Sequence, residues 1–430
     1  MRKPWLRAMR PLGVLLGSCI AFFNTPAADA GGMWMTESGG SDMGMAGAGA
    51  AATAFDGSVL EANPAGMARL PGTTITVAAV PALVQLDFKG SATTPGSAHN
   101  HEGPKLTGSA FAVQSFSGLS LGLGLYSYTG LGADFGDEWV GRRVIEHEQL
   151  RSLNIAPAVA YQVTDHLQFG GTLRAQYVEV EASLAVNNSA ALYGPPAGLP
   201  DGQVSLQGHS WSPGGDLGIA YQPRPDVELG LAWTSAVHHT VDFDVTAAGL
   251  HPVLGAILPQ ALPVSLSLTL PQQVAASGAW QATPATTLAA TARWQEWSTL
   301  GEARQMSGLG DRPMFPQGLR DTWGASLGVR HRLPDGTRLS AGVAYDSDPS
   351  REGTMPAYFP SSSQLRLALG GEWPAREDLT VRLALSVIQQ GEVRVAQLGH
   401  PLPLPGVGPL SGTFPASRFY FAALAVDFRR

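Results

Sequence analysis

The sequence contains one group of residues with the spacing of a catalytic motif. Gly118-Leu119-Ser120-Leu121-Gly122 has the G-x-S-x-G pattern that presents the nucleophilic serine of many hydrolases. In those enzymes the serine lies on a sharp turn between a strand and a helix. Here the alternation of residue types continues straight through the motif, which is typical of one extended strand. We therefore predict no nucleophilic serine here and no enzyme.

Two pairs of histidines have to be weighed as metal ligands. His99 and His101 fall in a long loop-like segment, and His238 and His239 are adjacent in a strand-like run. Adjacent strand residues point to opposite faces, so His238 and His239 cannot hold one ion together. Gly47-Ala48-Gly49 is part of a dinucleotide signature, but no hydrophobic strand precedes it and no βαβ unit follows. We predict no metal and no cofactor.

Most of the chain after Thr73 consists of runs with a period of two. In one of them Leu153, Ile155, Val159 and Tyr161 share one parity, while Asn154 and small residues occupy the other. Such alternation predicts strands with one apolar face and one polar or small face. Similar runs occur at 167–177, 217–221, 227–233, 288–295, 339–345, 365–373, 379–387 and 420–428.

The connections between these runs alternate between short and long. Short turns are expected at 163–165, 223–226, 283–284, 333–336 and 374–378, each preceded by a ring residue: Tyr161, Tyr221, Trp280, His331 or Trp373. Long segments are expected at 88–105, 129–149, 187–208, 247–263, 306–319, 346–362 and 393–417. This asymmetry and the ring residues beside the short turns are typical of outer-membrane barrels. We predict an all-β protein, a transmembrane antiparallel β-barrel of about 14 strands over residues 72–430, rather than a soluble β-sandwich.

The composition and the first residues agree with export. Of 430 residues 14% are charged and the net charge is −7, which argues against a nucleic-acid partner. Residues 1–30 have the basic start, the apolar run and the Ala28-Asp29-Ala30 site of a signal peptide. A lipid attached to the one cysteine, Cys19, is the alternative reading. We expect a monomer in the outer membrane of a Gram-negative bacterium, in contact with membrane lipid and lipopolysaccharide.

The segment between the leader and the first strand is rich in glycine and alanine. Residues 31–71 have no strand period, and they contain Asn63-Pro64-Ala65-Gly66. Glycine tolerates tight turns and alanine favours helix, so a compact segment of turns and short helices is expected. We predict that it is a hatch, or plug, that fills the lumen of the barrel.

The chain resembles the FadL/TodX-like family of outer-membrane transporters for long-chain fatty acids and other hydrophobic compounds. The resemblance runs from about Gly31 to the C-terminus, and its most specific parts are the stretch Ser38 to Leu70 and Trp139-Val140-Gly141-Arg142. Further matches, in chain order, are the residues 153–163, Gly218-Ile219-Ala220-Tyr221 with the turn after it, Leu270-Pro271-Gln272-Gln273, and Trp294-Gln295-Glu296-Trp297-Ser298. The resemblance implies a fourteen-stranded barrel with an N-terminal hatch, a hydrophobic pocket, and sideways release of substrate through a gap in the wall.

The residues that would serve such a transporter can be named. Apolar contacts with the substrate are expected from Met33, Trp34, Met35, Phe55 and Leu60, which could instead only pack the hatch against the wall. Parity places five arginines on inward faces, where each could bind a carboxylate or pair with inward acids such as Glu228, Glu296 and Glu372: Arg174, Arg293, Arg330, Arg366 and Arg382. The glycine-rich run 118–132 resembles the third strand, where the family has its gap, so Gly118, Gly122 and Gly124 are the candidates for a lateral opening.

We therefore expect a passive transporter of a hydrophobic small molecule. Two alternatives remain open at this point: an outer-membrane enzyme that acts on lipid, which needs serine, histidine and acid to meet at the outer rim, and an adhesin or receptor barrel whose loops only bind partners.

Overall fold

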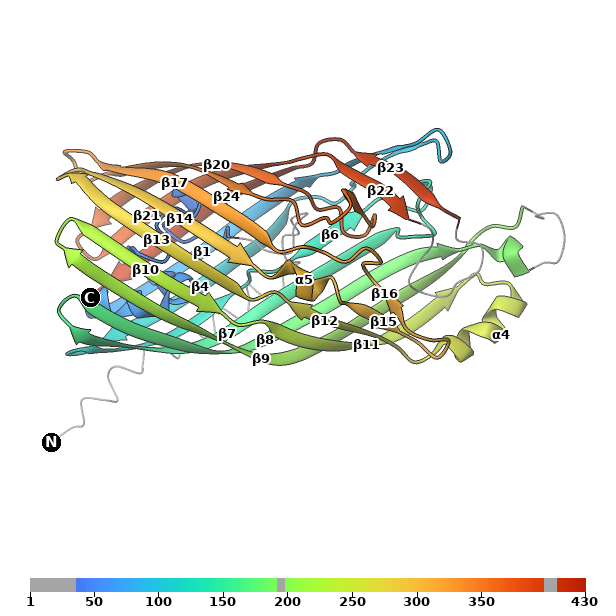
Figure 1. Cartoon of the computed structure of the whole chain (residues 1–430), viewed down its shortest axis with the longest axis horizontal. Coiled ribbons are helices and arrows are strands. Elements are labelled where there is room, and N and C mark those ends of the chain that lie inside the picture. The colour runs from blue at the N-terminus through green and yellow to red at the C-terminus, as the bar shows by residue number, and fades with distance from the viewer. Residues whose placement is uncertain (1–35, 192–197, 398–407) are drawn as a thin grey trace.

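The computed structural model describes residues 36–191, 198–397 and 408–430, and in these residues long tilted strands surround a hollow barrel (Figure 1). Fourteen membrane-spanning antiparallel strands are present in the described residues, five of them interrupted into two segments each. In chain order they are β1 (Thr73–Gln85), β4 (Lys105–Ser115), β5 with β6 (Leu119–Tyr126, Leu131–Asp134), β7 (His147–Thr164), β8 (Leu167–Val186), β9 (Gly202–Arg224), β10 with β11 (Val227–Thr234, Val237–Ala248), β12 with β13 (Val264–Leu270, Gln273–Thr283), β14 with β15 (Thr286–Gln295, Arg304–Met306), β16 with β17 (Arg312–Pro313, Thr322–Arg332), β18 (Arg338–Asp346), β20 (Gln364–Arg376), β21 (Leu379–Gln390) and β24 (Arg418–Arg429).

The barrel is closed by its first and last strands. β1 pairs with β24 along their length, from Thr74 opposite Arg429 to Gln85 opposite Arg418. This pairing satisfies the edges of the two terminal strands, as the absence of water in a bilayer requires. The predicted all-β barrel of about 14 strands is confirmed. Among the described residues, no helix has the length and apolar character needed to cross a bilayer.

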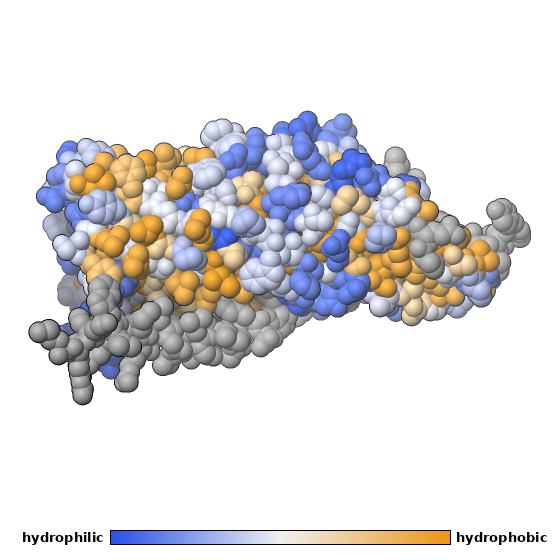
Figure 2. Space-filling model, turned by 90° about the horizontal axis from the view of Figure 1, so that it is seen from below, coloured by the Kyte–Doolittle hydropathy of each residue, from blue (hydrophilic) through white to orange (hydrophobic). Residues whose placement is uncertain are grey.

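The outer surface of the barrel carries the apolar residues that the sequence pattern placed on one parity. Leu173 is 75% exposed, whereas the next residue, Arg174, is 3% exposed and points inward. Leu327 and Leu369 repeat this pattern on the opposite wall. Figure 2 shows apolar residues gathered over the half of the surface nearer the short turns. A face of this kind is suited to lipid.

The predicted ring residues beside the short turns lie on the same outer surface. Tyr161, Tyr221, Trp280 and Trp373 are all exposed close to one end of the barrel. In Figure 1 this end also carries the C-terminus, and the long loops lie at the other end. The arrangement matches the aromatic girdle of a membrane barrel.

Residues 36–71 lie inside the barrel. Their short elements are the 3₁₀ helices η1 (Met43–Met45) and η2 (Pro64–Arg69) and the α-helix α3 (Val59–Ala62). The backbone of this N-terminal segment approaches the inner wall closely, and glycines make the room. A β-carbon at Gly230 would come within 1.8 Å of the Ala51 carbonyl oxygen, and one at Gly342 within 2.1 Å of Met45. Gly170, Gly218, Gly328 and Gly370 face the segment in the same way.

The end with the long loops is covered by a second, smaller sheet. Its five short strands are β2 (Asp87–Gly90), β3 (Ser97–His99), β19 (Thr354–Met355), β22 (Val393–Gln397) and β23 (Leu410–Phe414). The other helices of the described residues also belong to the loop end: η3 (Asn188–Ala191), α4 (Pro252–Ala261) and α5 (Trp297–Leu300). Beneath the small sheet, Phe88 packs against Trp139 and Phe414 with ring centroids 5.5 and 5.3 Å apart.

Candidate functional site

An apolar cavity of about 130 Å³ lies in the half of the barrel nearer the long loops. The strands β7, β8, β9, β11 and β12 contribute apolar side chains, and α5 and the segments after β16 and β19 complete the lining. The apolar lining residues are Ile145, Leu150, Val180, Ala182, Leu184, Leu206, Phe243, Leu266, Leu268, Leu300, Ala303, Met314, Phe315 and Phe359. Apolar cavities of about 150 Å³ bind molecules such as benzene, so this cavity can hold a small hydrophobic molecule.

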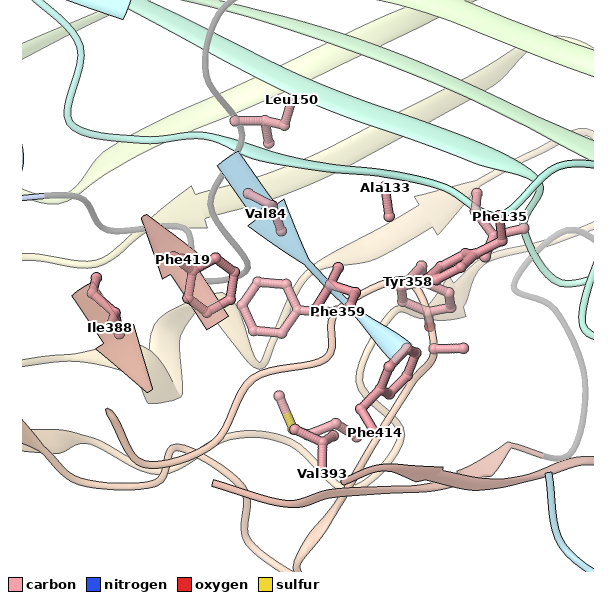
Figure 3. Close-up of a cluster of buried hydrophobic side chains, with 14 of the residues drawn as sticks. Val84, Ala133, Phe135, Leu150, Tyr358, Phe359, Ile388, Val393, Phe414 and Phe419 are labelled. Atoms are coloured by element: carbon pink, nitrogen blue, oxygen red, sulfur yellow. The ribbon is translucent and has the colours of Figure 1, made fainter. Parts of the chain in front are cut away.

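Aromatic side chains close the cavity on the side of the loops. Phe359 packs edge-on against Phe315 at 5.2 Å and lies 6.1 Å from Trp297, measured between ring centroids. Figure 3 shows Phe359, Phe414 and Phe419 converging from separate parts of the chain, with Leu150 nearby. The cavity is therefore bordered by a hydrophobic cluster whose residues come from the strands and from the outer loops.

Four of the five inward arginines make close ion pairs with acids. Nε of Arg366 lies 2.6 Å from Glu37, and Arg382 lies 2.7 Å from both Asp56 and Asp427. Two of these acids, Glu37 and Asp56, belong to the N-terminal segment. Ion pairs buried this deeply are held at the cost of removing both charges from water, so losing one partner is strongly destabilising.

The remaining arginines line the lumen on other sides. Arg174 lies 3.3 Å from Asp216 and donates a hydrogen bond of 2.5 Å to the Tyr128 hydroxyl. Arg330 pairs with Glu372 and stands 3.6 Å above the Phe55 ring.

Arg293 is the most loosely held of the five, with Asp346 4.0 Å away. Of the other acids considered in the sequence, Glu228 lies 3.7 Å from Arg69, and Glu296 accepts a hydrogen bond from Gln272.

The predicted apolar contacts of the N-terminal segment lie against the wall. Leu60 is fully buried among Met67, Phe111 and Tyr126, and Phe55 packs below Arg330. Neither residue lines the apolar cavity. The predicted contacts Met33, Trp34 and Met35, and the predicted signal peptide, lie outside the described residues.

Asn63 anchors the predicted Asn63-Pro64-Ala65-Gly66 turn to the wall. Its Nδ2 donates to the carbonyls of Ala51, at 2.6 Å, and of Ile219 on β9, at 2.9 Å. Its Oδ1 accepts from the Ala65 amide at 3.1 Å, which caps η2. The Asn63 side chain is fully buried, so no water can take over these hydrogen bonds if the side chain is removed.

We expect Asn63→Ala to loosen the segment without unfolding the barrel. The change leaves the buried Ala51 carbonyl without its donor, at a cost of about 1–3 kcal/mol, and removes the cap of η2. The measurement is protease cleavage within residues 36–71, together with heat-modifiable gel mobility as the readout of the barrel. Ser41→Ala is the control, because its side chain is not part of this anchor. Cleavage no faster than in the parent protein would contradict the assigned role of Asn63.

The third membrane strand is interrupted at residues 127–130, between β5 and β6. Gly118 lies in the preceding turn with φ +78°, and Gly122 and Gly124 lie within the regular part of β5, paired with Val113 and Phe111. A β-carbon at Gly122 would come within 2.6 Å of Leu60, so this glycine makes room for the N-terminal segment. The interruption begins only three residues after Gly124.

The seam between the second and third strands ends at this interruption. β4 pairs with β5 from Ser115 and Ser120 to Ala110 and Leu125, and the described residues beyond show no further pairing between these two strands. β6 is in register with β7 from Leu131 to Asp134. In the described residues no ladder joins 105–109 to 126–133. The seam is hydrogen-bonded again at Asp134, whose carbonyl accepts from the His101 amide at 2.7 Å and whose amide donates to Asn100 Oδ1 at 2.9 Å.

Side chains of β7 satisfy the interrupted backbone. Ser152 Oγ donates to the Thr129 carbonyl at 2.7 Å, and Asn154 donates to the Tyr126 carbonyl at 3.2 Å. The sequence interpretation did not identify Ser152, and it noted Asn154 only as a polar residue of a strand. In the sequence, the one signal for their role is that both residues have inward parity on a strand next to a glycine-rich strand. Polar groups left unpaired inside a bilayer are costly, so these contacts hold the interruption in place.

Charged loop residues hold two outer loops together beside the cavity. Arg142 and Arg143 lie 2.9 and 2.8 Å from Asp201. These two ion pairs join the loop before β7 to the loop before β9. Burial alone would raise the pKa of Asp201, but the hydrogen bonds and charges of Arg143 and Arg142 outweigh it and hold the pKa below its usual value. The carboxylate is therefore ionised at neutral pH, and the contact is intact.

A closed barrel with an apolar exterior, an N-terminal segment inside it and an apolar cavity above that segment defines an outer-membrane barrel of the transport class. Residues 21–425 match the family model described as "Outer membrane protein transport protein (OMPP1/FadL/TodX)", and the chain belongs to this family. The sequence-based prediction of this family is confirmed, as is the outer-membrane location.

Individual relatives agree with the family match. The long-chain fatty acid transport protein of Escherichia coli O6:H1 (strain CFT073) is 24% identical over 411 residues, covering 89% of this chain and 92% of the relative. Among solved structures, a Pseudomonas aeruginosa FadL homologue is 19% identical, with a TM-score of 0.79 over 93% of this chain and 99% of its own. The Ralstonia pickettii toluene transporter TbuX is 18% identical, with a TM-score of 0.66 over 95% and 99%. These two structures support the fold.

Proposed function

We propose that the protein is a passive transporter that carries hydrophobic molecules across the outer membrane. The apolar cavity is the observation that carries this proposal. A hydrophobic solute gains about 0.8 kcal/mol for each methylene that it buries away from water. A water-filled pore gives such a solute no favourable path, whereas an apolar cavity does, and no input of energy is required.

The path that we propose runs from the cavity to the interruption of the third strand. Leu150 lines the cavity, and its ladder partner is Leu131, the first residue after the interruption. The unpaired stretch of wall is therefore next to the cavity, which supports release of the substrate sideways into the membrane. We therefore propose that the lateral opening lies at residues 127–130, and not at Gly118, Gly122 and Gly124 as the sequence suggested.

The N-terminal segment is placed to act as a hatch for this opening. Ser109 lies on the part of β4 that pairs with β1 but not with β5, and its hydroxyl donates a hydrogen bond of 2.6 Å to the Ser38 carbonyl. The start of the segment thus lies directly behind the seam. Movement of residues 36–40 would widen the way from the lumen to the wall, while the rest of the segment, held by Asn63 and by ion pairs, keeps the bore filled.

An enzyme that acts on lipid has less support. Ser120 lies within β5, is buried, and shares a hydrogen bond of 2.9 Å with the Ser115 hydroxyl. A serine inside a straight strand does not have the exposed turn of a nucleophile elbow. A receptor barrel that binds partners only through its loops would have no use for the cavity.

Deletion of the gene should slow uptake of a labelled hydrophobic solute at limiting concentration, and expression of the full chain should restore it. A hydrophilic solute of similar size is the control, because its uptake through porins should not change. Uptake that is equal with and without the protein, for a neutral hydrocarbon as well as for a fatty acid, would contradict the proposal.

A further inference from the structure

We infer that the apolar cavity takes an uncharged hydrophobic molecule and discriminates against one that carries a carboxylate. This inference rests on the proposed function and specifies its substrate class. It depends on which polar side chains reach the cavity and on where the cations of the barrel are held.

The cavity has acidic and neutral polar groups at its surface. Glu148, Gln149, Glu181, Gln305 and Tyr358 are its polar lining residues, and the described lining contains no lysine, arginine or histidine. Of the two acids, Glu148 points inward: it shares the parity of the inward Leu150 on β7, opposite to that of the outward Arg151, and it is 9% exposed. Tyr358 donates its hydroxyl proton to the Met314 carbonyl, so it too offers no cation.

The nearest permanent cation on the outer face of β7 is already engaged. Arg151 lies 3.3 Å from Glu179 and 3.5 Å from Glu181. It shares the parity of the lipid-facing residues of this strand, on the other side of the wall from Leu150 and Glu148.

The inward arginines are also held by acids and lie away from the cavity lining. Arg174, Arg330, Arg366 and Arg382 each have a carboxylate oxygen within 3.3 Å. Arg293, with its carboxylate at 4.0 Å, lines two smaller polar cavities instead, one shared with Asp42 and the other with Asp346. A carboxylate that reached Arg293 would have to leave the apolar cavity and compete with both acids.

Among the described residues that line the cavity there is no lysine, arginine or histidine that could pair with a ligand carboxylate. Such a carboxylate would be buried in apolar surroundings next to Glu148. Burial of the ligand carboxylate without a cation and its repulsion by the Glu148 carboxylate both disfavour binding. A neutral solute has neither of these costs.

The test compares two ligands that differ only in their head group. Equilibrium binding of labelled 1-dodecanol and dodecanoate to the purified full-length protein in detergent is measured at pH 8. Leu268→Trp protein, in which the cavity is filled without an added charge, gives the background for ligand dissolved in detergent. The alcohol should bind at least about tenfold more tightly than the carboxylate, a difference that one unpaired buried charge easily produces.

A pair of variants tests the role of the cavity acid. Glu148→Gln should raise the affinity for dodecanoate, so the ratio between the two ligands falls. Glu179→Gln removes the same charge on the outer face of β8 and should leave the ratio as it is. Heat-modifiable gel mobility verifies that each barrel is folded.

The possible failures are distinguishable. If dodecanoate binds the Leu268-dependent site as tightly as the alcohol or more tightly, this inference is wrong and the transport proposal stands. If neither ligand shows saturable binding that depends on Leu268, the transport proposal fails and the inference fails with it.

Discussion

Uptake of a labelled hydrophobic solute should fall by at least about tenfold when Leu268 is replaced by arginine, because the cavity then contains a buried cation and has lost apolar volume. Leu268 is 3% exposed and contributes to the cavity from β12. Its side chain points inward, so the change leaves the lipid-facing surface of the barrel intact. The measurement is the initial rate of uptake in cells that express equal amounts of folded protein.

Leu268→Met is the matched control, because it keeps the volume and apolar character of the side chain. Its uptake should stay close to that of the parent protein. If Leu268→Arg transported the hydrophobic solute at the parental rate while its barrel remained folded, the cavity would not be on the transport path.

Removal of Glu37 should release the start of the N-terminal segment and make the outer membrane leaky. Glu37 is bound to Arg366 at 2.6 Å and to the Ser386 hydroxyl at 3.2 Å, and both charged side chains are almost fully buried. Leaving Arg366 without this partner costs about 3–5 kcal/mol. We expect Glu37→Ala cells to become sensitive to a large antibiotic that the intact membrane excludes, and residues 36–40 to become accessible to protease.

The double variant Glu37→Ala/Arg366→Met provides the control for this effect. It removes both charges, so no uncompensated cation remains and the leak should be smaller than in the single variant. A leak as large in the double variant would indicate that the lost contact itself, and not the unpaired arginine, opens the segment. Unchanged sensitivity in the single variant would contradict the proposed role of the segment as a hatch.

The barrel could be predicted from the sequence because its cause is local. A strand in a membrane barrel must alternate, and runs such as 153–161 and 379–387 show that alternation without knowledge of their neighbours. The same parity placed Arg174 and Arg382 on the inner face, where the structure has them.

The partners of these arginines could not be predicted in the same way. Arg366 and Glu37 are more than 300 residues apart, and their contact depends on the path of the N-terminal segment through the lumen. The gap in the wall was also hard to locate. Gly122 and Gly124 attracted attention as glycines in a strand, yet both make room for Leu60, while the interruption itself contains Ser127 and Thr129.

A hydrophobic pocket was expected from the resemblance, but its lining residues could not be identified from the sequence, for a related reason. Leu150 and Leu268 are inward aliphatic residues near the loop ends of long strands, where the simple alternation of an apolar outside and a polar inside no longer holds. Phe359 comes from an irregular loop and reaches the cavity only through tertiary packing.

The glycines of the inner wall have a consequence for how such proteins can be varied. At Gly230 and Gly342 even a single methyl group would collide with main-chain atoms of the segment inside. The shape of the inner wall and the shape of the segment must therefore change together. A chimera that takes its N-terminal residues from another barrel should assemble only when these wall positions are exchanged as well.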